Sequence, residues 1–360
     1  MTRVRPRPLS GTPRVSVVIP CYNYGRFLGE CVDSVLSQEG VDVDVLIVDD
    51  ASPDGSAEVA HQLAAADSRV RVIAREINKG HIATYNEGLA AVDGTYVLLL
   101  SADDLLAPGS LGRAAALMEA NPTVGLVYGF CPSFMDKPAP ARTNVTSWSI
   151  WPGLDWIEQV CRRVTNPVMT PEALVRGSLM RELGGYDPRI PYAADLLIWL
   201  RAGTRGQIGR VNGVDQAFYR KHGQNMHLQQ FAGVYTDMVE RLRTFDILFA
   251  DDAELIPEAD RLRQVVLRGL TREALLVVSR AYELGVEIDS EKQLIDLAEE
   301  MVPRTPDDPL WRRYGARLER ARAGQRRVPR QVDLVKEDLW GRIRWRRWRR
   351  YGLMSEVGSV

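Results

Sequence analysis

The sequence predicts an α/β fold: a doubly wound, mostly parallel sheet flanked by helices, followed by a C-terminal helical appendage. Three observations lead to this prediction. Short β-branched apolar runs alternate with helical patterns over the first hundred residues. Polar residues follow the runs at the points where strands would end. From residue 231 onward, apolar residues recur with helical spacing. Strands that alternate with helices form a parallel sheet, because each crossover returns the chain to the same end of the sheet.

The apolar runs predict four strands, and the segments between them predict three helices. The first run, 15–20, is β-branched and ends at proline, as a buried strand would. The turn-rich segment 49–55 favours the start of a helix. We expect strands at 15–20, 43–48, 70–74 and 96–100, and helices at 26–37, from the turn to about 66, and at 82–91.

Composition is that of a globular protein with a sizeable core. The chain has 360 residues, of which 45% are hydrophobic and 26% are charged. The four cysteines have no paired short spacing, which predicts reduced thiols in a cytoplasmic protein. No apolar run approaches the roughly 20 residues that span a bilayer. Residues 1–13 are rich in Arg and Pro and are expected to form a flexible tail.

The net charge of −1 conceals a basic C-terminal arm, since residues 304–350 hold 16 Lys and Arg against six Asp and Glu. Between Trp340 and Tyr351, arginine alternates with tryptophan. This pattern is typical of a segment that binds an anionic membrane surface, here on the cytoplasmic face. It could instead bind an anionic acceptor molecule, such as a lipid diphosphate or a peptide. The alternative is a helix whose tryptophans pack on the acidic body while its arginines remain in water. Nucleic acid is not expected as a partner.

Polar side chains follow three of the predicted strands. Tyr22 and Asn23 follow the first strand, Asp50 the second, and Asp103 and Asp104 the fourth. Because the carboxyl ends of parallel strands meet at one edge of a sheet, these side chains should lie along one crevice. Paired carboxylates at such an edge suit Mg²⁺ or Mn²⁺ carrying a diphosphate, and Tyr22 could stack on a base. Each residue alone could instead cap a helix or close a turn.

Eight short segments between residues 15 and about 225 form a characteristic series. They are Val-Val-Ile-Pro-Cys-Tyr-Asn (17–23), Val-Asp-Asp-Ala-Ser (48–52), Asn-Lys-Gly (78–80), Asn-Glu-Gly (86–88), Ser-Ala-Asp-Asp (101–104), Gly-Gly-Tyr-Asp (184–187), 195–201 and Tyr-Arg-Lys-His (219–222). In the order and spacing of these segments the chain resembles family 2 glycosyltransferases with the GT-A fold.

The resemblance implies a role for each matching residue. Tyr22 and Asp50 would bind the donor base, Asp103 the ribose, and Asp104 the Mn²⁺ or Mg²⁺ that bridges the diphosphate. His222 would meet the metal or the diphosphate, and Asp195 would act as general base on the acceptor hydroxyl. The metal set is then Asp104, Asp103 and His222. The residues implied to contact the nucleoside-diphosphate sugar, with UDP favoured, are Pro20, Tyr22, Asn23, Asp50, Lys79, Gly80, Asn86, Ser101, Ala102 and Asp103.

Three positions depart from the family pattern. Ser101 replaces the first carboxylate of the Asp-x-Asp motif, Ala194 replaces a glutamate before the base, and Tyr85 stands where arginine is usual. Metal binding is expected to survive the first change, because Asp103 and Asp104 are intact. The other two changes bear on the sugar and acceptor contacts.

Asp195 begins an otherwise apolar helix, and from the residues alone it could be an N-cap. Apolar surroundings should raise its pKa, which suits a general base. One base and one metal imply direct displacement with inversion at the anomeric carbon.

The resemblance also implies a domain organisation. Residues 14–130 would form the nucleotide-sugar-binding half of the GT-A domain, and 131–228 the acceptor-binding half. Residues 229–335 would form the helical appendage and 336–360 the basic segment. Tryptophans between 132 and 166 could form a sugar-stacking platform or belong to the core.

Two other classes of protein share parts of this pattern. A nucleotidyltransferase has a similar core but would carry a glycine-rich triphosphate loop after the first strand, where this chain has Pro20 to Asn23. A catalytically silent sugar-nucleotide-binding or scaffold protein is the second alternative, which the changes at 85, 101 and 194 suggest.

Overall fold

The computed structural model describes residues 1–225 and 233–325, which form two compact units. The first consists of Met1–Ile157 and Asn166–Asn225, and the second of Glu158–Thr165 with the described residues from 233 onward. The segments predicted as the two halves of one domain, 14–130 and 131–228, thus lie in the first unit apart from 158–165 and the last residues. The basic segment at 336–360 lies outside the described residues.

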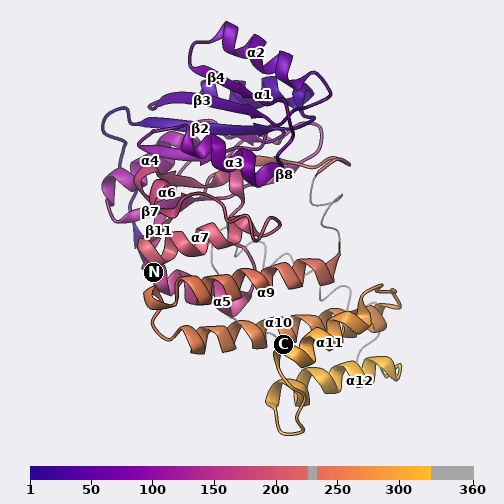
Figure 1. Ribbon diagram of the computed structural model, residues 1–360. Helices are drawn as coiled ribbons and strands as arrows, with labels where there is room; N and C mark the ends of the chain where they lie inside the picture. The colour runs from indigo at the N-terminus through magenta and orange to yellow at the C-terminus, as the bar shows by residue number, and fades with distance from the viewer. Residues whose placement is uncertain (226–232, 326–360) are drawn as a thin grey trace. The chain divides into compact units, whose positions relative to one another are not determined.

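The first unit is built on a nine-stranded sheet with the order β1-β9-β11-β7-β10-β5-β2-β3-β4 (Figure 1). Four strands run parallel: β2 (Arg14–Cys21), β3 (Asp42–Asp49), β4 (Val70–Ala74) and β5 (Tyr96–Leu99). These are the four predicted strands, each within one or two residues. Beyond them the chain adds β7 (Val124–Tyr128), β9 (Ser147–Trp151), β10 (Leu174–Arg176) and β11 (Gln207–Asn212). Of these, β10 runs antiparallel to both β5 and β7, so that β5 and β7 themselves point the same way.

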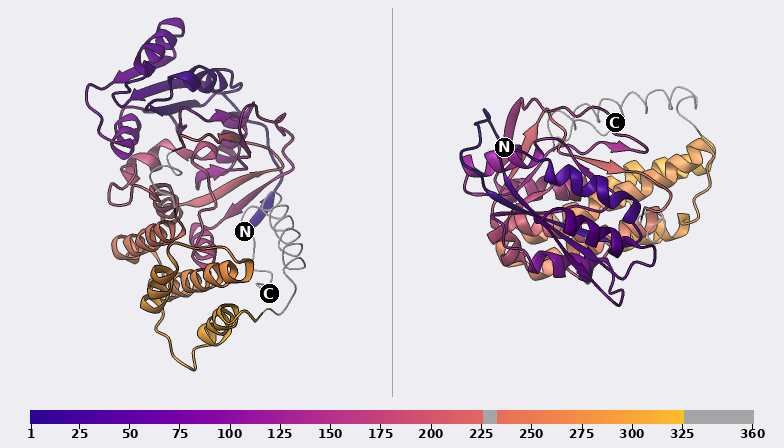
Figure 2. Two further views of the ribbon diagram at one scale, coloured as in Figure 1. Left: turned by 90° about the vertical axis from the view of Figure 1, so that its right-hand side faces the viewer. Right: turned by 90° about the horizontal axis from the view of Figure 1, so that it is seen from above.

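Helices cover both faces of this sheet (Figures 1 and 2). Alternate residues of β2 face opposite sides, so Val17 packs in the core with α1 (Gly25–Leu36) and α4 (Ser110–Ala120), while Val18 faces α3 (His81–Ala90). The helices of this unit also include α2 (Ser56–Ala66), α6 (Gly177–Leu183) and α7 (Ala194–Arg205), whereas α5 (Gly153–Arg163) begins in this unit and ends in the second. A small sheet of β6 (Leu105–Leu106), β12 (Ala217–Arg220) and β8 (Ser133–Phe134) follows the end of β5.

The prediction of a flexible tail at 1–13 was wrong for its first residues. Thr2–Val4 form β1, which pairs antiparallel with β9, and the Arg3 side chain donates to the Ser147 hydroxyl at 2.8 Å. The pairing covers the backbone groups of an otherwise exposed edge strand. Local composition does not reveal such a partner 144 residues away.

The tryptophans of the 132–166 region belong to the core. Trp148, Trp151 and Trp156 are each at most 2% exposed, so none of them can form a sugar-stacking platform. The prediction of a possible platform was therefore wrong, and the core alternative is confirmed.

The second unit is helical, as predicted for the region after 231. It contains α9 (Val234–Asp251), α10 (Ala259–Leu284), α11 (Glu291–Met301) and α12 (Ala316–Arg322), with η2 (Ala253–Leu255) and the π-helical turn η3 (Trp311–Gly315). The buried Arg241 side chain of α9 donates to Glu273 of α10 at 2.8 Å. It also donates to the backbone carbonyl of Val164. Over the residues described in both units, none of the helices has the length and apolarity to cross a membrane.

The contact between α3 and the sheet depends on a glycine. A Cβ at position 88 would lie 2.3 Å from Val18 Cγ1 and 3.1 Å from Val48 Cγ2. We expect Gly88→Ala to destabilise the protein by about 1–3 kcal/mol, because overpacking must displace α3 from the strands. Urea denaturation measures this change.

The matched control is Gly29→Ala on α1, where a Cβ meets nothing within 4 Å. There the substitution should stabilise the helix by about 0.5–1 kcal/mol. Equal unfolding midpoints for the two variants would contradict the close packing at Gly88.

Candidate functional site

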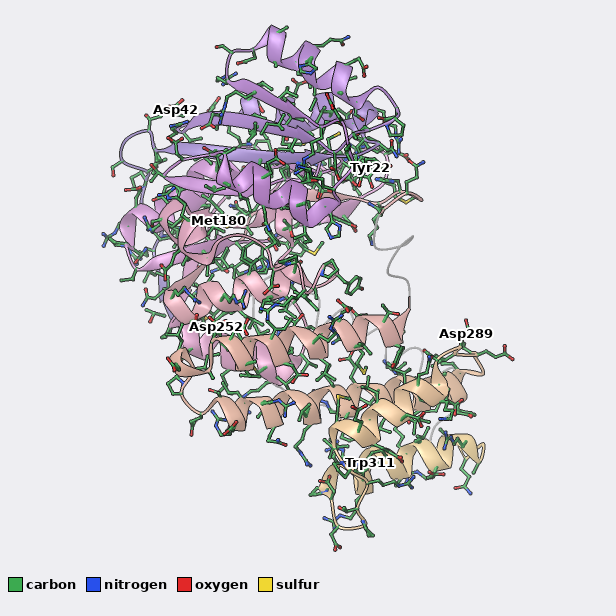
Figure 3. The ribbon with its side chains drawn as sticks, viewed as in Figure 1. Tyr22, Asp42, Met180, Asp252, Asp289 and Trp311 are labelled. Atoms are coloured by element: carbon green, nitrogen blue, oxygen red, sulfur yellow. The ribbon has the colours of Figure 1, made fainter. Side chains whose placement is uncertain are left out.

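The ends of the parallel strands meet along one edge of the sheet. Tyr22, which follows β2, lies at this edge, and Asp42, which begins β3, lies at the opposite edge (Figure 3). The Tyr22 side chain is 46% exposed and is therefore accessible to a ligand. Asn23 follows with φ of 61°, a left-handed conformation that asparagine tolerates, and its backbone N–H donates to the Ser52 hydroxyl at 3.1 Å.

Asp50 is buried and holds the start of α3. Its Oδ1 accepts from the Lys79 N–H and from the Arg75 guanidinium, both at 2.8 Å, and its Oδ2 accepts from the Gly80 N–H at 2.9 Å. Burial opposes ionisation, but the Lys79 N–H, Arg75 and the Gly80 N–H together lower the pKa of Asp50. Three donors occupy three of the four lone-pair positions of the carboxylate, which leaves one on Oδ2 for a ligand. The Lys79 side chain itself is exposed.

The acidic pair after β5 is also buried. Asp103 is 4% exposed and Asp104 is 1% exposed. Burial, together with the adjacent charge of Asp103 in the case of Asp104, raises the pKa of both carboxyls. Asp104 Oδ1 accepts from the Arg220 backbone N–H at 2.9 Å, whereas Asp104 Oδ2 is buried with no hydrogen-bond partner among the described residues. One carboxylate oxygen of the pair is thus available to a cation.

Arg220, at the end of β12, compensates the charge of this pair. Its guanidinium donates to the Asp103 carbonyl at 2.8 Å and to the Glu30 carboxylate at 2.6 Å. The same group lies over the rings of Phe27 and Phe134, with its carbon 4.8 Å and 4.5 Å from their centroids. Arg220 belongs to the segment Tyr-Arg-Lys-His (219–222) that resembles the family, but it was not predicted as a site residue.

His222 contacts Asp103 in a defined tautomer. The Gln224 backbone N–H donates to His222 Nδ1 at 3.2 Å, so in the neutral ring the proton is on Nε2. His222 Nε2 therefore donates to Asp103 Oδ2, 3.0 Å away. Asn225 donates to the same oxygen at 3.3 Å. In this arrangement His222 orients Asp103 and does not present a free nitrogen to a metal.

Ser101 and Ala102, which lie between β5 and the acidic pair, support the turn that carries the pair. The Ser101 carbonyl accepts from the Asp104 N–H at 3.0 Å, which closes the turn that carries both carboxylates. Ala102 is fully buried. Pro20, at the end of β2, is half-buried.

Asn86 is occupied by protein contacts. Its amide donates to the Tyr186 carbonyl at 2.8 Å and accepts from the Tyr186 N–H at 2.7 Å. Tyr85, the residue before Asn86 on α3, packs edge-to-face on the Tyr186 ring, with 5.4 Å between the ring centroids. The Asn86 amide therefore holds α3 against the 184–193 loop that leads into α7.

Asp195 is the second residue of α7, and the N-cap position is occupied by Ala193. The reading of Asp195 as an N-cap was therefore wrong. Its Oδ1 accepts from the Leu196 N–H at 2.7 Å and its Oδ2 from the Asn166 amide at 2.8 Å. Burial raises the pKa of Asp195 to about 6, as expected for a carboxyl in apolar surroundings.

Sequence reasoning missed three residues that hold the predicted ones: Arg75 at Asp50, Arg220 at the acidic pair and Asn166 at Asp195. Their partners lie 25, 117 and 29 residues away along the chain. Only Arg220 carried a signal, since it falls within a motif that resembles the family.

Within the described ranges, 1–225 and 233–325, no group of three or more His, Cys, Asp or Glu is placed to hold an ion. Two carboxylates are nevertheless sufficient for Mg²⁺ or Mn²⁺ when substrate phosphates complete the coordination. The pair with its unpartnered Asp104 oxygen fits that kind of site.

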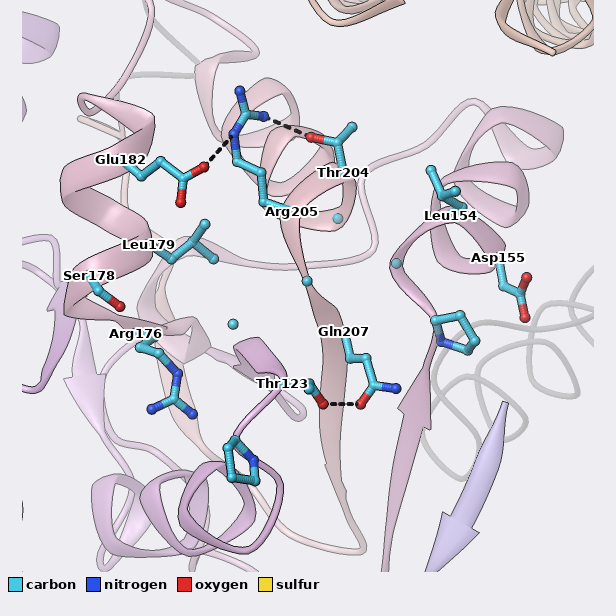
Figure 4. A pocket seen from close by; sticks show the side chains of 16 residues that line it. Thr123, Leu154, Asp155, Arg176, Ser178, Leu179, Glu182, Thr204, Arg205 and Gln207 are labelled. Atoms are coloured by element: carbon cyan, nitrogen blue, oxygen red, sulfur yellow. Dashed lines mark hydrogen bonds and ion pairs between the residues drawn. The ribbon is translucent and has the colours of Figure 1, made fainter. Parts of the chain in front are cut away.

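A cavity of about 680 Å³ lies away from this edge (Figure 4). It is lined by residues at the C-terminal end of α7, including Thr204 and Arg205, whereas Asp195 lies at the N-terminal end of that helix. Arg205 pairs with Glu182 at 3.3 Å across it. The cavity is thus distinct from the candidate site.

Comparisons with known proteins agree with this geometry. The family model described as "Glycosyl transferase family 2" matches residues 16–163. The chain is 34% identical over 125 residues to an uncharacterized glycosyltransferase, EpsJ, of Bacillus subtilis, a match that covers 35% of this chain and 36% of EpsJ. It is 25% identical over 227 residues to a hyaluronan synthase of Pasteurella multocida, covering 62% of this chain and 22% of the synthase. The chain therefore spans about a third or less of the length of these two relatives.

Solved structures show the same fold. Residues 1–349 of TarS from S. aureus, in complex with UDP-GlcNAc, superpose with a TM-score of 0.58 at 18% identity, covering 87% of this chain and 88% of TarS. A mannosyltransferase of Pyrobaculum calidifontis in complex with GDP-Man and Mn²⁺ gives 0.50 at 16% identity, with 89% of each chain covered. The chain therefore contains a family 2 glycosyltransferase domain with the GT-A fold.

Proposed function

We propose that this protein transfers a sugar from a nucleoside-diphosphate donor, UDP-linked, to a hydroxyl-bearing acceptor, with inversion at the anomeric carbon. The observation that carries the proposal is the placement of Asp50 and Asp103–Asp104 at strand ends within residues 16–163, which match the family 2 glycosyltransferase model, together with Asp195 at the start of α7. The acceptor classes to be considered are lipid-linked saccharides, secondary metabolites and peptides.

The donor would lie along the edge where β2, β3 and β5 end. Exposed Tyr22 is available to stack on the base, and the remaining lone pair of Asp50 Oδ2 can accept one N–H of a uracil. The structural neighbours give support, because TarS was solved with UDP-GlcNAc and the mannosyltransferase with GDP-Man. Asp103 and Asp104 would hold a divalent cation, which as a Lewis acid offsets the charge on the leaving diphosphate.

Asp195 would act as the general base. As the acceptor oxygen forms its bond to the anomeric carbon, Asp195 takes the hydroxyl proton and the bond to the diphosphate oxygen breaks. Attack from the face opposite the diphosphate inverts the anomeric configuration. A carboxylate whose pKa is raised to about 6 is still ionised at pH 7 and is a stronger base than an ordinary aspartate.

Donor binding is tested by thermal shift with UDP-GlcNAc, GDP-mannose and dTDP-glucose, each with and without Mn²⁺. A ligand at a hundredfold excess over Kd stabilises by about 2.7 kcal/mol, so a UDP-sugar should raise the Tm visibly in Mn²⁺. Asp104→Asn should lose the Mn²⁺-dependent part of the shift, because an amide does not balance the cation's charge. Asp155→Asn, at an exposed position of α5, is the control and should keep it. A full shift in Asp104→Asn would contradict the assigned cation site.

Catalysis is tested by hydrolysis of the donor, in which water replaces the acceptor. Asp195→Asn should reduce the hydrolysis rate by about 10²–10⁴-fold, since general-base catalysis contributes this much. The donor-induced rise in Tm should remain, because the substitution leaves the acidic pair and Asp50 intact. A wild-type protein that binds a donor and never hydrolyses it would instead support the silent, sugar-nucleotide-binding alternative.

The pH dependence follows from the raised pKa of the base. Asp195 acts only when deprotonated, so the rate should be full above its pKa of about 6 and fall as the pH drops through that value. Below it, hydrolysis should decrease about tenfold for each pH unit. Initial rates between pH 5 and 8 measure this limb. A profile that is flat down to pH 5 would assign the base elsewhere.

A further inference from the structure

Asn166 makes a directed contact with Asp195. Its Nδ2 donates to Asp195 Oδ2 at 2.8 Å, while its own Oδ1 accepts from the Val168 N–H at 3.1 Å. The second bond defines the orientation of the amide, because a backbone N–H can bond only to the oxygen end. The nitrogen end must then face the carboxylate.

The segment that carries Asn166 is anchored by a buried carboxyl. Glu172 is 3% exposed, and its two oxygens accept from the Met169 N–H and the Gly129 N–H, both at 3.1 Å. The bond from Met169 joins two residues of the same loop. The bond from Gly129 attaches this loop to the residue after β7. The loop that carries Asn166 is therefore held in place by the hydrogen bonds of Glu172.

We propose that Asn166 is a positioning residue for the general base, a role that rests on the function proposed for Asp195. With the Leu196 N–H on Oδ1 and Asn166 on Oδ2, both carboxylate oxygens are held and the plane of the group is set. A donor on each oxygen also favours the ionised form that can take a proton.

Other titratable groups near Asp195 do not supply this contact. The phenol of Tyr85 faces it from α3 and that of Tyr186 from the 184–193 loop. Burial raises the pKa of both phenols, so they stay neutral between pH 5 and 8 and their charge cannot change the titration of Asp195 in that range. A shift caused by substitution of Asn166 can thus be assigned to the lost amide.

The test is a titration of Asp195 by NMR with ¹³C-carboxyl-labelled aspartate, its signal assigned by its absence in Asp195→Asn. In Asn166→Ala the pKa should rise from about 6 to about 7, because a hydrogen bond to a charged group is lost. Asn166→Asp keeps the acceptor for the Val168 N–H and the side-chain size, and it places two carboxyls together. Its upper pKa should rise further than in the alanine variant. Met169→Ala, 41% exposed in the same loop, is the control and should leave the titration unchanged.

Donor hydrolysis supplies a second readout with UDP-GlcNAc and Mn²⁺. A pKa that moves from about 6 to about 7 lowers the ionised fraction roughly fivefold at pH 6 and hardly at pH 8. Loss that is equal at both pH values would indicate general damage and overturn the role. So would an unchanged Asp195 titration in both folded Asn166 variants.

The two hypotheses fail in different ways. If Asp195 is not the base, wild-type hydrolysis will not follow its titration, although the NMR shift in the Asn166 variants remains. If Asn166 does not position Asp195, hydrolysis by the wild type will follow the titration while the variants titrate normally.

Discussion

Two adjacent carboxylates, Asp103 and Asp104, are buried at the end of β5, and much of the surrounding structure compensates them. Removing such charges from water costs several kcal/mol per ion unless partners replace the solvent. The partners come from β12 and the residues after it: the Arg220 side chain and N–H, His222 and Asn225. The small sheet of β6, β12 and β8 brings Arg220, at the end of β12, to this pair. Within the ranges 1–225 and 233–325, one oxygen of Asp104 has no hydrogen-bond partner, and this is the oxygen for which we propose a cation.

Helix α3 is held at its start and in its middle by polar contacts. The N–H groups of Lys79 and Gly80, just before its first residue, bond to Asp50, where the carboxylate also meets the positive end of the helix dipole. Six residues after Gly80, Asn86 bonds to both backbone groups of Tyr186, and a Cβ added at Gly185 would lie 2.4 Å from the Asn86 oxygen. The resemblance implies that Asn86 contacts the donor. In the structure its side chain bonds α3 to the loop that leads to Asp195.

Local pattern was sufficient to predict the parallel half of the sheet, the positions of Asp50, Asp103 and Asp104 at strand ends, and the raised pKa of Asp195. These depend on β-branched runs, on the direction of parallel strands and on apolar neighbours in sequence. The β1–β9 pairing, the burial of Trp148 and the donors Arg75 and Asn166 depend on contacts between segments far apart, and composition carries no record of them. The role of His222 in metal binding stays a prediction, and the tautomer set by Gln224 could not be read from the sequence at all.

Strand β10 runs in the opposite direction to its neighbours β5 and β7. Leu174 at its start pairs with Leu98 near the end of β5, so the segment before β10 arrives at the same edge as the acidic pair. A parallel strand in this place would have delivered that segment to the far edge. A single inverted strand therefore lets one loop, at 166–173, contribute to the site from the opposite chain direction. Insertions or substitutions in that loop can alter the surroundings of Asp195, the residue proposed to act on the acceptor hydroxyl, during evolution while the parallel strands keep their register and the surroundings of Asp50 are unchanged.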